Sequence, residues 1–77
     1  MRLIVYSVIW TEVDDLLRDE LDNIFPTEES AVRSALKIAK QSNIYQVEVY
    51  KDEVTEEYGR HPLRLVFREK HEERLGI

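Results

Sequence analysis

The sequence contains no cysteine, so disulfide bonds and zinc sites built on thiolates are excluded. Its only two glycines, Gly59 and Gly76, stand far apart, and a glycine-rich loop that cradles phosphate groups is therefore excluded too. Proline is equally scarce, with two residues, and long flexible linkers are not expected. The lack of cysteine fits a reducing compartment, and we expect the protein to be cytoplasmic.

Long hydrophobic runs are also missing. The apolar stretch within residues 1–10 is too short to cross a membrane, and it lacks the small-residue cleavage site of a signal peptide. We therefore interpret this stretch as a β-strand and expect no membrane partner.

The chain is short and acidic, and both properties limit its function. Its 77 residues form one domain, residues 1–77, which buries only about 60% of the surface that the unfolded chain exposes. Such a core leaves little room for a water-excluded catalytic cavity, and we predict a protein that is not an enzyme and has no cofactor or metal. The net charge of −5 disfavours direct binding of nucleic acid, because phosphate groups are repelled by an acidic surface.

Three segments have clear secondary-structure patterns. Residues 3–10 are apolar on both faces of a strand, which is typical of a central strand or of one whose second face meets a partner. Residues 27–42 are expected to form an amphipathic helix, with Thr27 as its N-cap and an alanine-rich apolar stripe. Residues 44–51 alternate as a strand with one buried and one solvated face.

The C-terminal part of the chain continues this plan. Charged residues and Gly59 predict a turn or loop over residues 52–61, and Pro62 opens a further alternating strand that pairs antiparallel with residues 44–51. Residues 71–77 are expected to be a polar tail. The predicted fold class is α+β, a small antiparallel sheet of three to four strands with one main helix packed on one face.

Residues 12–22 are compatible with two structures. Apolar residues recur at helical spacing between acidic ones, and Asp14 and Asp15 would suit the positive end of a helix dipole. Alternatively, Asp14 and Asp15 turn the chain, and residues 17–25 alternate as a second strand. We expect the short helix, because strands rarely contain so many acidic residues.

The negative charge is concentrated between Thr11 and Ser30. This segment has eight acidic residues and one basic residue, Arg18, for a charge of −7, which leaves +2 for the rest of the chain. Such an array is either a solvated face that keeps the protein soluble or a nucleic-acid mimic that occupies arginine and lysine clusters of a basic protein. The candidate contacts of such a mimic are Asp14, Asp15, Asp19, Glu20 and Asp22.

Two aromatic residues, Trp10 and Tyr50, are expected to remain partly exposed and to anchor a protein interface, since so small a core cannot enclose every ring. The two-sided apolar first strand also suggests a structural homodimer as an alternative function. A third hypothesis is a small hydrolase or nuclease that uses His61 or His71 with nearby acidic residues. The spacing around His71, however, matches no recognised zinc motif.

In the middle of the chain, a capped, alanine-rich helix leads directly into a strand. The segment comprises Phe25-Pro26-Thr27-Glu28-Glu29, then Ala31, Ala35 and Ala39-Lys40, then Tyr45-Gln46-Val47-Glu48-Val49-Tyr50-Lys51. This layout resembles small accessory proteins of phages and mobile elements, which include anti-CRISPR proteins and other host-takeover inhibitors. The resemblance implies a tiny, acidic, non-catalytic inhibitor, and it carries over no binding residue.

These observations together predict a non-catalytic protein-binding module, a phage-type inhibitor that presents an acidic surface to a basic host protein. The main alternative is the homodimer with a structural role. No motif in the sequence identifies the partner.

Overall fold

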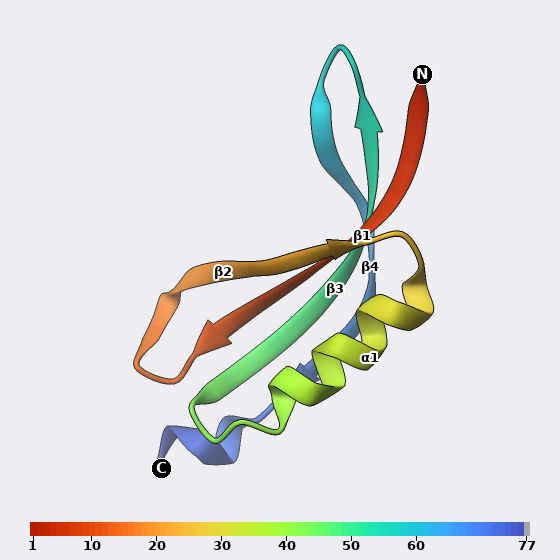
Figure 1. Ribbon diagram of the computed structural model, residues 1–77. Coiled ribbons are helices and arrows are strands. Elements are labelled where there is room, and N and C mark those ends of the chain that lie inside the picture. The colour runs from red at the N-terminus through yellow and green to blue at the C-terminus, as the bar shows by residue number, and fades with distance from the viewer. Residues whose placement is uncertain (77) are drawn as a thin grey trace.

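The protein forms an antiparallel four-stranded sheet with one α-helix packed on it (Figure 1). The computed structural model describes residues 1–76 of the chain. The strands lie in the order β2-β1-β3-β4, so the α+β fold class and the central position of the first strand are confirmed. The elements are β1 (Arg2–Glu12), β2 (Asp15–Phe25), α1 (Glu28–Ala39), β3 (Ile44–Thr55), β4 (Gly59–Lys70) and the 3₁₀ helix η1 (Glu72–Leu75).

Helix α1 begins at the predicted cap. The Thr27 hydroxyl accepts a hydrogen bond from the backbone N–H of Ser30 at 3.2 Å. Glu28 and Glu29 lie in the first turn, where the helix dipole favours negative charge. The helix ends before the predicted end at residue 42, and its buried stripe consists of Ala31, Ala35, Ile38 and Ala39.

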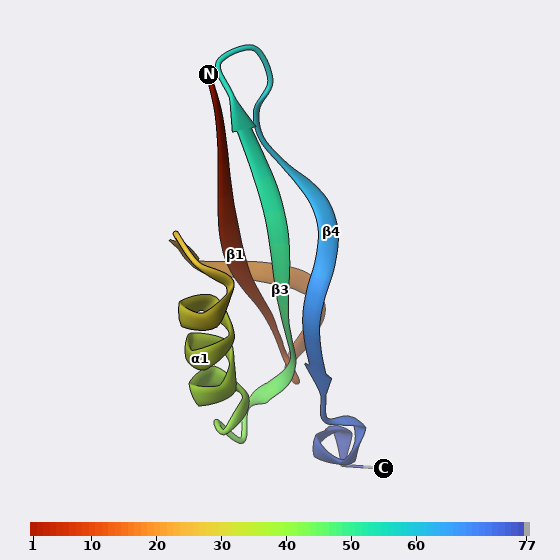
Figure 2. The same ribbon diagram turned by 90° about the vertical axis from the view of Figure 1, so that its right-hand side faces the viewer.

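The core lies between α1 and the two central strands. Val8 of β1 pairs with Val49 of β3, and both are fully buried beneath the helix together with Val47. Because side chains alternate along a strand, the neighbours of these valines point to the other side of the sheet. Figure 2 shows α1 on one side only, and no element within residues 1–76 covers the other side, which we call the open face.

The prediction of a helix over residues 12–22 is wrong, and the alternative hairpin is the observed structure. A turn at residues 13 and 14 leads into β2, which pairs antiparallel with β1. Since β2 is an edge strand, its acidic side chains can stay in solvent, and charges at an edge also prevent pairing with another chain. The Thr11 hydroxyl on β1 donates a hydrogen bond to Asp19 at 2.8 Å. Pairing with β1 therefore outweighs the low strand propensity of the acidic residues.

The predicted loop over residues 52–61 is also wrong in its extent, because both strands continue through most of it. β3 extends to Thr55, and β4 begins at Gly59, whose φ of 67° is a left-handed conformation that glycine adopts without strain. The charges that suggested a loop instead form contacts across the hairpin, such as the 2.8 Å ion pair between Arg60 and Asp52.

The polar tail contains η1, which is linked to the C-terminal end of α1 by hydrogen bonds from Arg74. One guanidinium nitrogen of Arg74 donates to the backbone carbonyls of Ala39, Gln41 and Ile44 at 2.7, 2.8 and 3.0 Å. These carbonyls lie at and just after the C-terminal end of the helix, where a positive charge is favourable. The last residue of the predicted tail, Ile77, lies outside the described residues.

Candidate functional site

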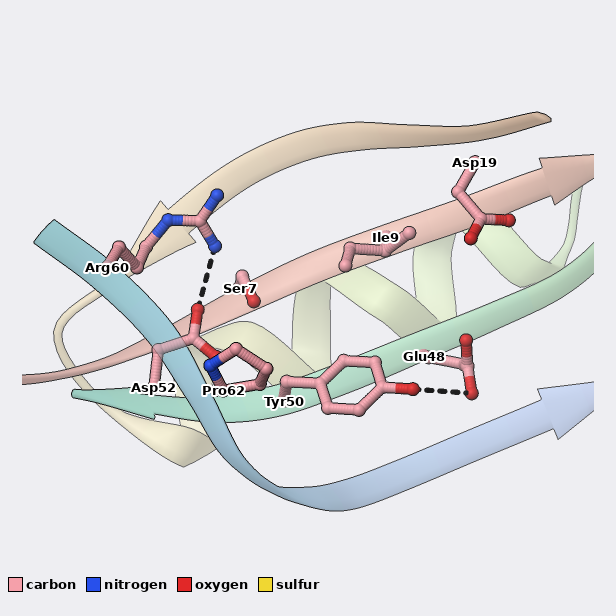
Figure 3. Close-up of a pocket in the computed structure, with 8 residues that line it drawn as sticks. All are labelled: Ser7, Ile9, Asp19, Glu48, Tyr50, Asp52, Arg60 and Pro62. Carbon is pink, nitrogen blue, oxygen red and sulfur yellow. Dashed lines mark hydrogen bonds and ion pairs between the residues drawn. The ribbon is translucent and has the colours of Figure 1, made fainter. Parts of the chain in front are cut away.

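A pocket of about 300 Å³ lies on the open face (Figure 3). All four strands contribute to it, and Figure 3 shows α1 behind the strands, with the lining side chains in front of them. We call this site the open-face pocket. Its lining residues are Ser7, Ile9, Asp19, Glu48, Tyr50, Asp52, Arg60 and Pro62.

Asp52 is a fully buried carboxylate at one end of the open-face pocket, with 1% of its surface exposed. Its Oδ2 atom accepts a hydrogen bond from Arg60 at 2.8 Å, whereas its buried Oδ1 atom has no partner within residues 1–76. The hydroxyl oxygen of Ser7 on β1 is likewise buried without a partner among these residues. Because a buried polar atom without a hydrogen bond is costly, both atoms are suited to contact a bound group.

Glu48 is the centre of a second polar cluster in the pocket. Three donors converge on its Oε2 atom, namely Arg68 Nη2 at 2.6 Å, Arg68 Nε at 3.0 Å and the Tyr50 hydroxyl at 3.2 Å. The hydrogen bond to Glu48 and its negative charge raise the pKa of Arg68 above its ordinary value. Glu48 itself is buried, so the prediction of a solvated face for residues 44–51 is wrong at this position.

The Tyr50 hydroxyl has a raised pKa. Burial shifts this pKa above its ordinary value of 10.0, and the charge of Glu48 and the hydrogen bond to it shift it further in the same direction. In a pH titration of tyrosinate absorbance, the part of the signal that is missing from a Tyr50→Phe variant belongs to Tyr50. We expect this part to have its midpoint above pH 10.0. Glu48→Gln removes the charge, so the Tyr50 midpoint should fall in that variant. A midpoint that stays the same in Glu48→Gln would contradict this contact.

The raised pKa also has a consequence for stability. The folded protein favours the protonated phenol, so Tyr50 contributes stability that is fully present below its unfolded pKa and is lost as the pH rises through its folded pKa. Urea unfolding at several alkaline pH values should therefore show a loss of stability in the wild type that is smaller in Tyr50→Phe.

Exposed apolar side chains lie beside the open-face pocket. The strand register places Leu3, Leu21, Ile24 and Leu65 on this face. Each of these four residues exposes between 37% and 53% of its surface. We call them the apolar rim. Large apolar side chains gathered on one exposed face are typical of an interaction surface.

The open-face pocket brings together two of the predicted interface residues. Asp19 and Tyr50 line the open-face pocket, and they come from β2 and β3. Asp14 is exposed in the turn between β1 and β2, and Asp15 is exposed at the start of β2. The hairpin therefore spreads these acidic residues from the pocket to its tip.

The remaining predicted residues lie on the helix side of the sheet. Trp10 is opposite Glu20 in the pairing of β1 with β2, and both are half-buried. Trp10 and Asp22 line a smaller pocket of about 120 Å³ near the C-terminal end of α1. The five acidic candidates consequently do not form one continuous array on one face.

Four polar residues of the open-face pocket were not predicted from the sequence, namely Ser7, Glu48, Asp52 and Arg60. A usable signal exists for Glu48, because strand alternation places it on the same side as Tyr50. Ser7 interrupts an otherwise apolar strand, which is a weaker signal of the same kind. Asp52 and Arg60 gave no signal, since they lie in the segment predicted as a loop.

Both histidines lie outside the lining of the open-face pocket. Nε2 of His61 is 3.3 Å from Glu53, and the two ring nitrogens of His71 are 2.6 Å from Glu69 and 3.1 Å from Glu73. Within residues 1–76, no three His, Cys, Asp or Glu side chains are arranged to hold a metal ion. The hydrolase or nuclease hypothesis stays a prediction.

The described part of the chain contains no helix that is both long enough and apolar enough to span a membrane. No family model, curated protein or solved structure matches this chain. The open-face pocket and the apolar rim are therefore the features on which a function can be argued.

Proposed function

We propose that this protein is a non-catalytic protein-binding module whose open face docks on a basic surface of another protein. One observation carries the proposal, namely an uncovered sheet face that combines an apolar rim with a pocket lined by the carboxylates of Asp19, Glu48 and Asp52. Three of the four rim residues pair directly with residues of the pocket, since Leu21, Ile24 and Leu65 lie opposite Ile9, Ser7 and Tyr50. Apolar contacts and charged contacts would thus be made by one continuous surface.

The distribution of charge supports a basic partner. The segment from residue 11 to residue 30, which includes β2, has a charge of −7 and adjoins the pocket through Asp19. Acidic side chains attract arginine and lysine clusters and repel phosphate groups, so we propose that the partner is a protein and not a nucleic acid. Asp14 and Asp15 at the hairpin tip would extend the attraction beyond the docking face. The role of a phage-type inhibitor is part of this proposal and rests on the sequence resemblance alone.

A homodimer is the second candidate, and the apolar rim is the observation that favours it. Two copies that packed their open faces together would cover Leu3, Leu21, Ile24 and Leu65, which are exposed in the single chain. Such a dimer would be held mainly by apolar contacts and would persist at high salt. Docking on a basic partner would instead weaken as salt increases, because surface charges are screened within about 10 Å at 0.1 M ionic strength.

The test compares leucines on opposite sides of the molecule. We expect Leu21→Gln and Leu65→Gln, on the open face, each to weaken capture of a basic partner from a host lysate by about tenfold at low salt, as truncation of a central interface residue typically does. Leu36→Gln on the outer side of α1 is the matched control, because Leu36 exposes 43% of its surface and Leu21 exposes 46%. Unchanged capture by both open-face variants would refute the proposal. Light scattering that shows a wild-type dimer at high salt, dissociated by the same two variants, would favour the homodimer.

A further inference from the structure

The three carboxylates of the open-face pocket share one arrangement of hydrogen bonds. In each of them one oxygen is occupied by a donor of the protein itself, and these donors are Thr11 for Asp19, Arg68 and Tyr50 for Glu48, and Arg60 for Asp52. The second oxygen of each carboxylate forms no hydrogen bond within residues 1–76. The pocket therefore offers free acceptors from two strands, β2 and β3, and the Oδ1 atom of Asp52 among them is fully buried.

The charges of the pocket are not balanced by its own residues. Two of the three carboxylates pair with a guanidinium group, Asp52 with Arg60 and Glu48 with Arg68, so the negative charge of Asp19 remains. This carboxylate is exposed at the pocket, and one monovalent cation would neutralise it through charge-assisted hydrogen bonds. The Ser7 hydroxyl, buried and without a partner among the described residues, adds an uncharged acceptor on the same floor.

The walls of the pocket suit an aliphatic or planar group more than a small ion. Ile9 and Pro62 provide apolar surface, and Tyr50 provides an aromatic ring that can pack against a delocalised cation. A volume of about 300 Å³ is at the lower end of the range for ligand sites, which fits one inserted side chain.

We propose that the open-face pocket binds the guanidinium group of an arginine side chain of the partner protein, an inference that rests on the proposed function. A guanidinium carries five N–H donors in a planar fork, and it can therefore reach several separate acceptors, as the pocket offers. A lysine ammonium is a compact point charge with stronger hydration, and it would satisfy fewer of them. The arginine stem packs between Ile9 and Pro62. Its head lies between the free oxygens of Asp19 and Glu48, two carboxylates at the same end of the pocket (Figure 3).

The experiment is a titration of the ¹⁵N-labelled protein with N-acetyl-arginine amide, followed by amide chemical shifts at low ionic strength. We expect saturable shifts centred on β1 and β3 around Ile9 and Glu48. N-acetyl-lysine amide should bind more weakly, and N-acetyl-citrulline amide, which has nearly the same shape without the charge, should give no saturable shift.

Two variants with the same change in charge test the site. Asp19→Asn removes a carboxylate of the pocket, and we expect it to weaken binding of the arginine probe by about tenfold, as the loss of a charged acceptor does. Asp15→Asn removes a carboxylate from the same strand outside the pocket, and binding should stay within about twofold of the wild type. Both positions are exposed, so folding is expected to be unaffected.

Several results would overturn the inference. They are the absence of saturable shifts at the pocket, equal binding of the citrulline or lysine probe, and equal weakening in Asp15→Asn and Asp19→Asn. Pocket shifts that grow with protein concentration alone would indicate that a second copy is the occupant, and they too would overturn it. If the probe fails while Leu21→Gln and Leu65→Gln still lose the partner, the docking face stands and only its arginine contact is wrong.

Discussion

Ala35→Leu is expected to lower the free energy of unfolding by about 3 kcal/mol, at the upper end of the cost of overpacking a core. Ala35 is fully buried in the middle of α1, in the same core cluster as Val8 and Val49 of the sheet. Three additional carbon atoms would have to displace the helix from the strands. For a domain with a total stability of roughly 0.05–0.15 kcal/mol per residue, this loss is a large fraction of the whole.

The control for this change introduces leucine at an exposed position of the same helix. Lys37→Leu adds an apolar side chain to α1 without entering the core, since Lys37 is exposed, and its effect should stay within about 0.5 kcal/mol. Urea unfolding followed by the fluorescence of Trp10 and by circular dichroism measures both variants. Equal stability of Ala35→Leu and the wild type would mean that the helix does not pack on the sheet as closely as described.

Arg60→Met is expected to destabilise the protein by about 2 kcal/mol, because it leaves the Asp52 carboxylate buried without its ion-pair partner. Loss of one partner from a fully enclosed pair costs roughly 3–5 kcal/mol, and we expect less here because 36% of the Arg60 side chain is exposed. Methionine retains much of the aliphatic packing of the arginine stem, so the measured loss reports mainly on the charge.

A change at Asp52, the partner of Arg60, provides an internal check on the expected effect of Arg60→Met. Asp52→Asn in the Arg60→Met background removes the unpaired charge and should recover about 1 kcal/mol of the loss. The control is Arg64→Met, the same substitution at an exposed position of β4, for which a change within about 0.5 kcal/mol is expected. If Arg60→Met and Arg64→Met were equally stable, the contact with Asp52 would not contribute to the fold.

The sequence predicted the fold where local and long-range preferences agree. The Thr27 cap and the alanine stripe specify α1 through local geometry, and the same stripe supplies the surface that packs on the sheet. The apolar character of residues 3–10 on both faces correctly indicated the centre of the sheet, since β1 pairs with β2 on one side and with β3 on the other.

The helix prediction for residues 12–22 failed because local preference and tertiary pairing disagree in this segment. The acidic residues argue against a strand, but an edge strand faces water on one side, and β1 supplies all the partners that β2 needs. Two residues of the spacing that suggested a helix, Leu21 and Ile24, both reach the open face because a bulge lies between them in the pairing with β1.

The candidate site was less accessible to prediction, for a physical reason. Whether Asp52 is solvated or buried depends on Arg60 and Pro62, which reach it only after the chain has turned back as β4. The pairing of β3 with β4 also shifts on either side of Tyr50 and Lys51, so the side chains that β4 adds to each face cannot be read from alternation. The sequence analysis did include Asp19 and Tyr50, because an acidic or an aromatic side chain is a candidate interface residue wherever it lies in the fold.

The strand order has a kinetic meaning as well as a structural one. β1–β2 and β3–β4 are hairpins of adjacent segments, whereas the seam between β1 and β3 joins distant residues, from Glu12 with Ile44 to Arg2 with Thr55. Closing a long loop costs entropy before any contact across it is gained, which slows folding relative to a fold with only local contacts. We therefore expect the joining of the two hairpins to be the slow step of folding, the step at which α1, tethered between them, acquires the surface it covers.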